Sequence, residues 1–351
     1  MRAISFVEAL REGTDQLLMA DNSVYLIGEG VPDPKHIFGT TAKLKDKHPT
    51  RVFDMPISEN GLTGVAIGSA LNGMKPIMVH QRMDFTLYAV DQIINNAAKW
   101  YSMFGGQKSV PLVIRMIIGR GWGQGNQHSQ NLEALYAHVP GLKVVVPSSA
   151  YAAKGMLVSA VEDPNPVIFI EHRWLHNTTS DVPQELYRVP IGKARVAQNG
   201  KDVTIVTWSY MTLEVMKAVE YLEKQNVSVD VLDMQTIRPM DIPAIKESVK
   251  KTGRLVVADD AWKFGSLAGE VIASVCEDET INLKSHPRRI TYPDFPSPST
   301  HGLTKYYYNG PREVVAAVGK ALGRDLDLKE VSAYQEARVH DVPDQNFKGP
   351  F

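Results

Sequence analysis

Residues 111–118 read PLVIRMII, and residues 203–208 read VTIVTW. Both runs are almost entirely apolar, which is typical of parallel strands that are buried on both faces of a sheet. Short runs of this kind alternate with amphipathic helical stretches along the chain. The alternation predicts an α/β fold with parallel sheets, because a parallel strand pair needs a long crossover that is usually a helix.

Two such series follow one another, so we expect two domains. In the first, from 1 to 177, the expected strands are 24–27, 51–54, 76–80, 110–117, 143–146 and 167–171, with helices at 5–20, 59–72, 90–102, 131–138 and 150–161. A polar, proline-containing stretch at 178–200 predicts a linker. The second, smaller domain spans 201–324 and is near the usual domain size. Residues 325–351 are polar and predict an extended arm or a disordered tail.

Composition excludes several classes of protein. The 351 residues include 38 Lys plus Arg and 39 Asp plus Glu. This near balance gives no reason to expect nucleic acid or an anionic membrane as a partner. The single cysteine, Cys276, rules out a disulfide framework within one chain. No apolar run approaches the roughly 18 residues of a membrane span, and we expect a cytoplasmic protein.

In open α/β sheets, sites form beyond the carboxyl ends of the strands. The first such end is RVFDMPISENGLTG, residues 51–64, where Glu59 begins a glycine-rich helix. A carboxylate there is also explained by the helix macrodipole, which favours it by roughly 0.3–1 kcal/mol. The second is PIMVHQRMDF, residues 76–85, where Gln81 and Phe85 follow a strand. A polar strand end followed by one core aromatic is the simpler alternative.

The third strand end is GRGWGQGNQHSQ, residues 119–130. A dinucleotide-binding reading is weak here, because no acidic residue ends the next strand, and no Gly-Lys-Ser/Thr follows for a P-loop. We interpret the segment as a catalytic loop that delivers His128; a flexible loop with an incidental histidine is the alternative. Asp163 and Asn165, in a turn that also contains Pro164 and Pro166, are either ordinary turn residues or oxygen ligands for a hard cation.

Taken in order, these phrases resemble one family: the beta subunits of the decarboxylating component of 2-oxo acid dehydrogenases of the pyruvate, branched-chain and acetoin types. The resemblance covers about residues 3–323 and rests on ISENGLTG, QHSQNLEALYAHVPGLKVV, EDPNPVIFIEH and, in the second domain, IRPMD. It implies a thiamine-diphosphate pyrimidine-binding domain at 1–177 and a transketolase C-terminal-like domain at 201–324. It also implies an enzyme that decarboxylates a 2-oxo acid and passes the acyl group on, in the complexes to a lipoyl acceptor.

The resemblance assigns roles to particular residues. Glu59 matches the glutamate that exchanges a proton with the aminopyrimidine ring of thiamine diphosphate. Phe85 matches an aromatic residue against the face of that ring, Gln81 a polar neighbour of the cofactor, and His128 the histidine that faces the substrate. Leu112, Ala160, Asp163 and Asn165 match a potassium site, in which Leu112 and Ala160 act through their carbonyl groups.

Half of the expected site is missing from this chain. The Gly-Asp-Gly segment that normally holds the diphosphate through Mg²⁺ does not occur in the sequence. The resemblance therefore implies an alpha-type subunit that supplies the diphosphate and Mg²⁺ ligands, in an α2β2 heterotetramer. A lipoyl acyltransferase component is a further expected partner.

Some segments depart from the family pattern. After Gly28–Gly30 the chain reads VPDPKHIFGTT instead of a glycine-rich stretch, and near the end it reads PDFPSPSTHGLTKYYYNG. The loop before QHSQ carries Arg120 and Trp122, which would suit a larger polar acceptor. These departures leave open a same-family alternative that transfers the acyl or ketol fragment to another carbonyl compound such as a sugar, as an acyloin-forming enzyme or a split transketolase.

Overall fold

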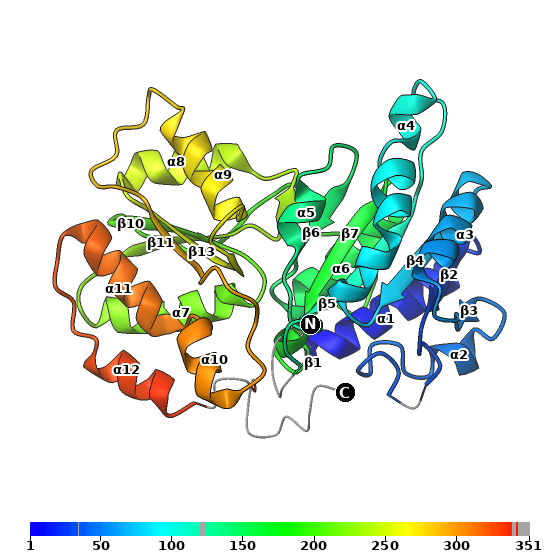
Figure 1. Ribbon diagram of the computed structural model, residues 1–351, viewed down its shortest axis with the longest axis horizontal. Helices are drawn as coiled ribbons and strands as arrows, with labels where there is room; N and C mark the ends of the chain where they lie inside the picture. Colours follow the sequence, from blue (N-terminus) through cyan, green and yellow to red (C-terminus); the bar gives the residue numbers. More distant parts are fainter. Residues whose placement is uncertain (34, 120–123, 339–341, 343–351) are drawn as a thin grey trace.

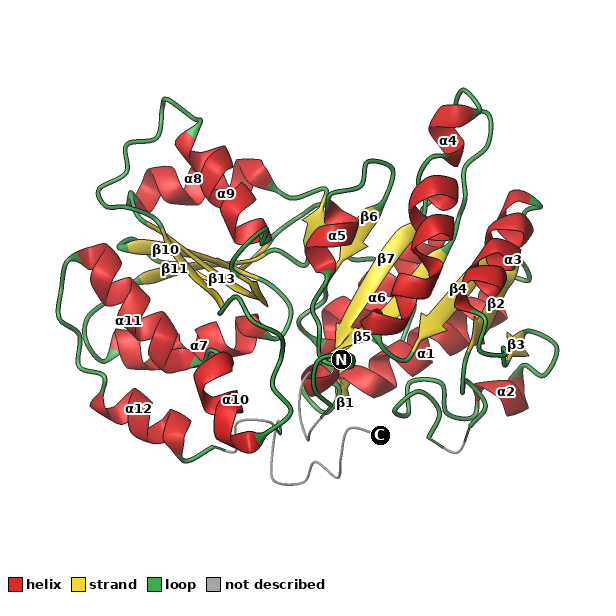
Figure 2. Cartoon of the chain, in the orientation of Figure 1, coloured by secondary structure: helices red, strands yellow, loops and turns green. Residues whose placement is uncertain are grey.

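Strand β5 (Val113–Ile118) is buried along its whole length, as its apolar sequence requires, and it lies at the centre of a seven-stranded sheet. The computed structural model of the protein describes residues 1–33, 35–119, 124–338 and 342. Its two α/β domains stand side by side, each with helices on both faces of its sheet (Figures 1 and 2). The predicted two-domain α/β fold is therefore confirmed.

The first domain holds a seven-stranded sheet in the order β12-β6-β7-β5-β4-β2-β3. Six strands run parallel: β2 (Val24–Gly28), β3 (Val52–Phe53), β4 (Lys75–His80), β5, β6 (Lys143–Val145) and β7 (Val167–His172). Their carboxyl ends consequently meet at one edge of the sheet, where the polar segments of the sequence follow them.

Helices cover both faces of this sheet. Helices α1 (Phe6–Ala20) and α6 (Ala150–Glu162) pack together over one face, in a core with apolar residues of β2, β4, β5 and β7. Over the other face lie α3 (Glu59–Leu71), a 3₁₀ helix η1 (Met83–Ala89), a π-helix η2 (Gln92–Ala97) and α5 (Glu133–Ala137). Short helices α2 (Leu44–Lys47) and α4 (Trp100–Met103) lie in connections.

The second domain has a five-stranded sheet in the order β14-β13-β10-β11-β9. Strands β10 (Val203–Thr207), β11 (Val229–Asp233), β13 (Leu255–Trp262) and β14 (Arg288–Tyr292) are parallel, and β9 (Arg195–Gln198) is antiparallel. Helices α8 (Ile242–Thr252) and α9 (Leu267–Cys276) cover one face, and α7 (Met211–Glu223) and α11 (Pro311–Leu322) the other (Figure 1). Helix α10 (His301–Tyr307) precedes α11.

The two domains share a strand and a core. Strand β12 (Thr236–Arg238) comes from the second half of the chain, yet it pairs antiparallel with β6 of the first sheet. Trp208 of the second domain donates from Nε1 to the carboxylate of buried Glu133 at 2.6 Å. Burial raises the pKa of Glu133, and burial together with the charge of Glu133 raises the pKa of Asp259 well above its usual range.

Two expected segments differ from the prediction. The stretch 178–200, expected to be a linker, contains β8 (Thr179–Val182), which pairs with β1 (Arg2–Ser5), and β9 of the second sheet. The stretch 325–351, expected to be an arm or a tail, contains helix α12 (Lys329–Glu336). In both cases short elements gain their stability from tertiary partners, so that local sequence periodicity does not reveal them.

The expected helix at 90–102 is also different. The structure has the π-helix η2 followed by the single turn α4, in place of one continuous α-helix. None of the helices in the described part of the chain combines the length and the apolar character that a bilayer crossing requires.

Candidate active site

The carboxyl ends of β2, β3 and β4 are held together by side chains that follow them. The Asp54 carboxylate after β3 accepts hydrogen bonds from the backbone amides of Gly30 and Met55, each at 3.0 Å. The Gln81 side-chain amide, after β4, donates to the carbonyl of Glu29 at 3.1 Å. These contacts fix the loop after β2 against the ends of two other strands.

Gly30 is required where the loop turns. Its φ is +70°, a conformation that residues with a Cβ atom rarely adopt. A Cβ atom there would also lie 2.5 Å from the Gln81 side-chain nitrogen. The close approach of backbone to Gln81 therefore depends on the glycine.

Glu59 begins helix α3 and is 8% exposed. Its negative charge is felt by Glu29: burial raises the pKa of Glu29, and the charges of Glu59 and Asp54 raise it further. Two carboxyl groups of adjacent strand ends thus interact across the site.

The predicted aromatic and imidazole groups lie together. The rings of Phe85 and His128 meet edge to face, with centroids 5.3 Å apart and an interplanar angle of 87°. Both line a cavity of about 430 Å³ that Gln81 also lines. The structure thus brings Gln81, Phe85 and His128 to one cavity. Glu59 is not among the residues that line it, and it is connected to them through Glu29.

Asp84 is a site residue that our sequence analysis did not single out. It is 7% exposed, and its carboxylate accepts a hydrogen bond from the Gln130 side chain at 2.7 Å. Burial raises the pKa of Asp84. Because Gln130 follows His128 by two residues, this bond ties the histidine segment to η1, which carries Phe85. The only signal in the sequence was a carboxylate directly beside Phe85.

The residues predicted for a potassium site lie where β5 begins and where α6 and β7 meet. The Leu112 carbonyl accepts from the Val167 amide at 2.9 Å. The Ala160 carbonyl, in the last turn of α6, has no N–H four residues on, because that residue is Pro164. The Asp163 carboxylate is paired with the Lys143 ammonium and accepts from the Asn165 amide. The segments therefore fit a cation through backbone carbonyls, while the Asp163 carboxylate already has a positive partner.

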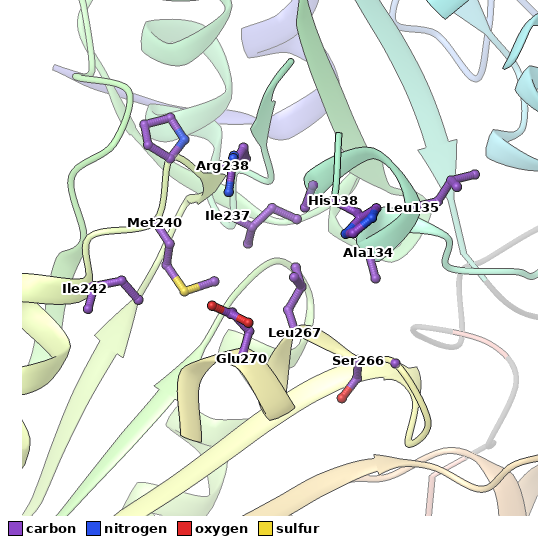
Figure 3. A pocket seen from close by; sticks show the side chains of 13 residues that line it. Ala134, Leu135, His138, Ile237, Arg238, Met240, Ile242, Ser266, Leu267 and Glu270 are labelled. Atoms are coloured by element: carbon purple, nitrogen blue, oxygen red, sulfur yellow. The ribbon is translucent and has the colours of Figure 1, made fainter. Parts of the chain in front are cut away.

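A larger cavity, of about 840 Å³, lies between the domains and contains none of the predicted residues. Its walls come from α5, from the segment that includes β12, and from α9 (Figure 3). The side chains there are mostly apolar, such as Leu135, Met240 and Leu267. Its imidazole and carboxylate, His138 and Glu270, are both exposed. The smaller cavity is the better candidate for chemistry, because it gathers Gln81, His128 and the buried Arg82 beyond the strand ends.

Arg120 and Trp122, which the sequence links to a larger polar acceptor, lie outside the described residues. Among the described residues, there is no group of three or more His, Cys, Asp or Glu side chains that could hold a metal ion.

Residues 2–178 match the transketolase pyrimidine binding domain family, and residues 192–314 match the transketolase C-terminal domain family. The chain is 38% identical to the beta subunit of acetoin:2,6-dichlorophenolindophenol oxidoreductase from Cupriavidus necator, over 92% of this chain and 98% of that protein. It is also 38% identical to the pyruvate dehydrogenase E1 component subunit beta of Acholeplasma laidlawii, over 91% of this chain and 98% of that one.

The chain is also similar to a plant protein and to a solved structure. A mitochondrial pyruvate dehydrogenase E1 subunit, beta-2 of Oryza sativa, is 39% identical over 92% of this chain and 87% of its own length. A solved structure described as a split-gene transketolase in an inactive beta4 tetramer superposes with a TM-score of 0.76 at 27% identity. It covers 91% of this chain and 99% of that one.

Proposed function

Because this chain belongs to the family of the beta subunits of 2-oxo acid dehydrogenase E1 components, we propose that it is the beta subunit of a thiamine-diphosphate-dependent enzyme that decarboxylates a 2-oxo acid. The acyl group is then transferred to an acceptor, which in this proposal is a lipoyl group on an acyltransferase component. The single observation that carries the proposal is the cavity at the strand ends, where Gln81, Phe85 and His128 meet beside the Glu29–Glu59 pair.

Each side chain has a task that its surroundings suit. Bound thiamine diphosphate supplies the electron sink for decarboxylation. Glu59, shielded from water, would hold and exchange a proton with the aminopyrimidine ring. Phe85 would pack against the ring face, and Gln81 would hold the polar edge of the site. His128 would face the substrate, kept in place by the bond between Asp84 and Gln130.

The proposal includes an alpha-type partner in an α2β2 assembly. The chain has no Gly-Asp-Gly segment to hold a metal-bound diphosphate. Four large apolar side chains just before α3, on α3 and on η1 are exposed: Ile57 by 86%, Val65 by 58%, Leu87 by 44% and Tyr88 by 73%. Helix α3, which carries Val65, contacts η1, which carries Leu87 and Tyr88. Exposed apolar groups concentrated beside a half-formed site support a subunit interface at this face.

Two cations belong to the proposal. Mg²⁺ would be held mainly by the alpha partner, since this chain offers no ligand set among its described residues. K⁺ would bind the carbonyls of Leu112 and Ala160 with backbone oxygens of Asp163 and Asn165, and would brace α6 against the sheet. The free carbonyls at the carboxyl end of α6 favour a cation there through the helix dipole. We also propose a cytoplasmic site of action, which suits a chain with one cysteine.

The test is Glu59→Gln in the chain co-expressed with its alpha partner. We expect assembly to persist and carbon dioxide release to fall by at least about a hundredfold, because the amide cannot exchange the proton. Glu185→Gln, a change of an exposed carboxylate outside the site, is the matched control. Unchanged turnover in the Glu59 variant would contradict the proposed role of Glu59 in proton exchange.

A further inference from the structure

The loop after β2 contains an unusual left-handed turn. His36, Ile37 and Phe38 have φ values of +46°, +49° and +57° in succession. Residues with a Cβ atom rarely take this conformation once, and a run of three is disfavoured still more. Such a backbone persists only where surrounding contacts impose it, and it tends to occur at binding sites.

Several contacts hold the turn. The Gly39 amide donates to the Lys35 carbonyl at 2.9 Å, and the Thr41 amide donates to the His36 carbonyl at 3.1 Å. The Thr41 hydroxyl donates to the Val31 carbonyl at 2.9 Å. The Ile37 side chain is buried, 3% exposed. The turn is therefore anchored from within, and its polar side chains are placed by the backbone.

The turn directs positive charge to the cavity of the candidate site. Lys35 and His36 line the same 430 Å³ cavity as Phe85 and His128, and so does Arg82. The Nδ1 atom of His36 is buried and has no hydrogen-bond partner in the structure. An imidazole held at a cavity wall with an unused nitrogen is suited to contact a ligand.

A second arginine, Arg173, adds positive charge near the Phe38 ring, as Arg82 does. The guanidinium carbons of Arg82 and Arg173 lie 4.8 Å and 4.7 Å from the centre of the Phe38 ring. Burial and, to a smaller extent, the charge of Arg173 together lower the pKa of Arg82 to about 10, so Arg82 stays protonated at neutral pH. The opposing carboxylates are Asp33, which lines the cavity, and Asp84.

We propose that Lys35, His36 and Arg82 form a subsite for an oxyanion, carboxylate or phosphate, at the far end of a 2-oxo acid substrate. The inference rests on the proposed function and adds to it a substrate class: 2-oxo acids that carry a second acidic group. Arginine and lysine are the side chains that bind such groups most strongly, through charge-assisted hydrogen bonds. A 2-oxo acid without a second acidic group would make no such charge-assisted hydrogen bonds with these residues.

The experiment compares matched substrates in the cofactor-loaded complex with the alpha partner. One pair is 2-oxoglutarate and 2-oxopentanoate, and the other is 3-phosphohydroxypyruvate and hydroxypyruvate. We expect the acidic member of at least one pair to have the higher kcat/KM, by about tenfold to a hundredfold. The pair that shows the preference distinguishes a carboxylate from a phosphate tail.

The variant Lys35→Gln/His36→Asn then tests the residues. Asparagine tolerates a left-handed backbone, so the turn can persist without its charge. We expect the preference to fall by about tenfold or more, while Lys201→Gln, an exposed lysine of the second domain, keeps it. The proposal would be overturned if the ratio of kcat/KM for the acidic substrate to that for its matched substrate without the second acidic group were below one in both pairs. It would also be overturned if this ratio in the double variant stayed within twofold of the wild-type ratio.

A binding measurement separates this inference from the proposed function. Inorganic phosphate is titrated calorimetrically into the complex whose diphosphate site is already filled by thiamine diphosphate. We expect heat in the wild type and at least about tenfold weaker binding in the double variant. Equal binding in both would refute the subsite even if the enzyme turns over. Absence of carbon dioxide release with every 2-oxo acid would instead refute the proposed function, and phosphate binding would still decide the subsite.

Discussion

At the scale of single residues, burial decides which side chains of this protein can take up protons. His80 and His176 are 3% and 0% exposed. Burial lowers the pKa of His80 to about 4 and is also the main reason why the pKa of His176 falls to about 4. His80 lies at the end of β4, immediately before Gln81, and is therefore held neutral beside the candidate site.

These two histidines predict how stability depends on pH. Their folded pKa lies below the ordinary 6.5, so the unfolded chain binds protons first as the pH falls. Their contribution to the free energy of unfolding should be constant above pH 6.5 and should decrease between pH 6.5 and 4, by on the order of 3 kcal/mol for each fully buried histidine. Urea unfolding of wild type, of His80→Gln and of the exposed His286→Gln measures this. His80→Gln should have a shallower slope than the other two, and equal slopes would contradict the prediction.

Some residues of the candidate site could be predicted from the sequence, and others could not. The strand-end position of Gln81, Phe85 and His128 could be predicted, because parallel strands end at one edge and those residues follow strands. The cavity contribution of Lys35 and His36 could not be predicted. The sequence indicated only a departure from the family pattern there, and a β-branched residue such as Ile37 gives no sign of a left-handed backbone. The roles assigned to Glu59, Gln81, Phe85 and His128 remain predictions.

At the scale of elements, helix α12 illustrates what tertiary contacts add. Its sequence is mostly polar, but Val331 is 1% exposed in the core of the second domain. The Gln335 side chain donates to the Glu313 carboxylate at 2.8 Å and accepts from the Arg312 amide at 3.0 Å. Both partners belong to α11, so the terminal helix is fastened to an element that is amphipathic in its own right.

We predict that Val331→Ala destabilises the second domain by about 1–3 kcal/mol, through lost burial and the space left behind. The measurement is the urea midpoint of the variant against wild type. Glu336→Gln, an exposed change on the same helix, is expected to change the free energy of unfolding by less than about 0.5 kcal/mol. Identical midpoints for Val331→Ala and wild type would mean that α12 is not part of the cooperative unit.

Other elements escaped prediction for the same reason. Strand β12 has three residues, and its partner β6 lies about 90 residues earlier in the chain, so no local pattern indicates that it extends the first sheet. The π-helix η2 keeps an apolar periodicity close to that of an α-helix, and one helix over 90–102 was the natural expectation. The long buried strands and the amphipathic helices α1, α7, α8 and α11 were predictable, because their apolar spacing is strong and local.

At the scale of the whole molecule, the site is assembled at one edge of the first sheet and stands next to exposed apolar surface. Hydrogen bonds of Asp54 and Gln81 tie together the loops after β2, β3 and β4. These bonds make the edge of the sheet rigid where the site lies. On the other side, α3 and η1 present large apolar groups to solvent. A rigid half-site with an apolar border is what a subunit needs if the remaining half comes from a partner.

The last prediction follows from this border. Val65 lies on α3, six residues after Glu59, and is 58% exposed. Val65→Asp should leave the fold of the isolated chain unchanged, because the side chain is largely in solvent. In the complex it would place an unpaired charge in an apolar interface, and binding of the alpha partner should weaken by about tenfold to a hundredfold. Co-purification and titration of the partner measure this. Val65→Thr, which keeps the shape, should weaken binding less. Met19→Glu places a charge at an exposed apolar position of α1 on the opposite face of the sheet and should have no effect. If Val65→Asp and Met19→Glu bind the partner equally well, the partner contacts a different face, and the site cannot be completed at the edge where Glu59 lies.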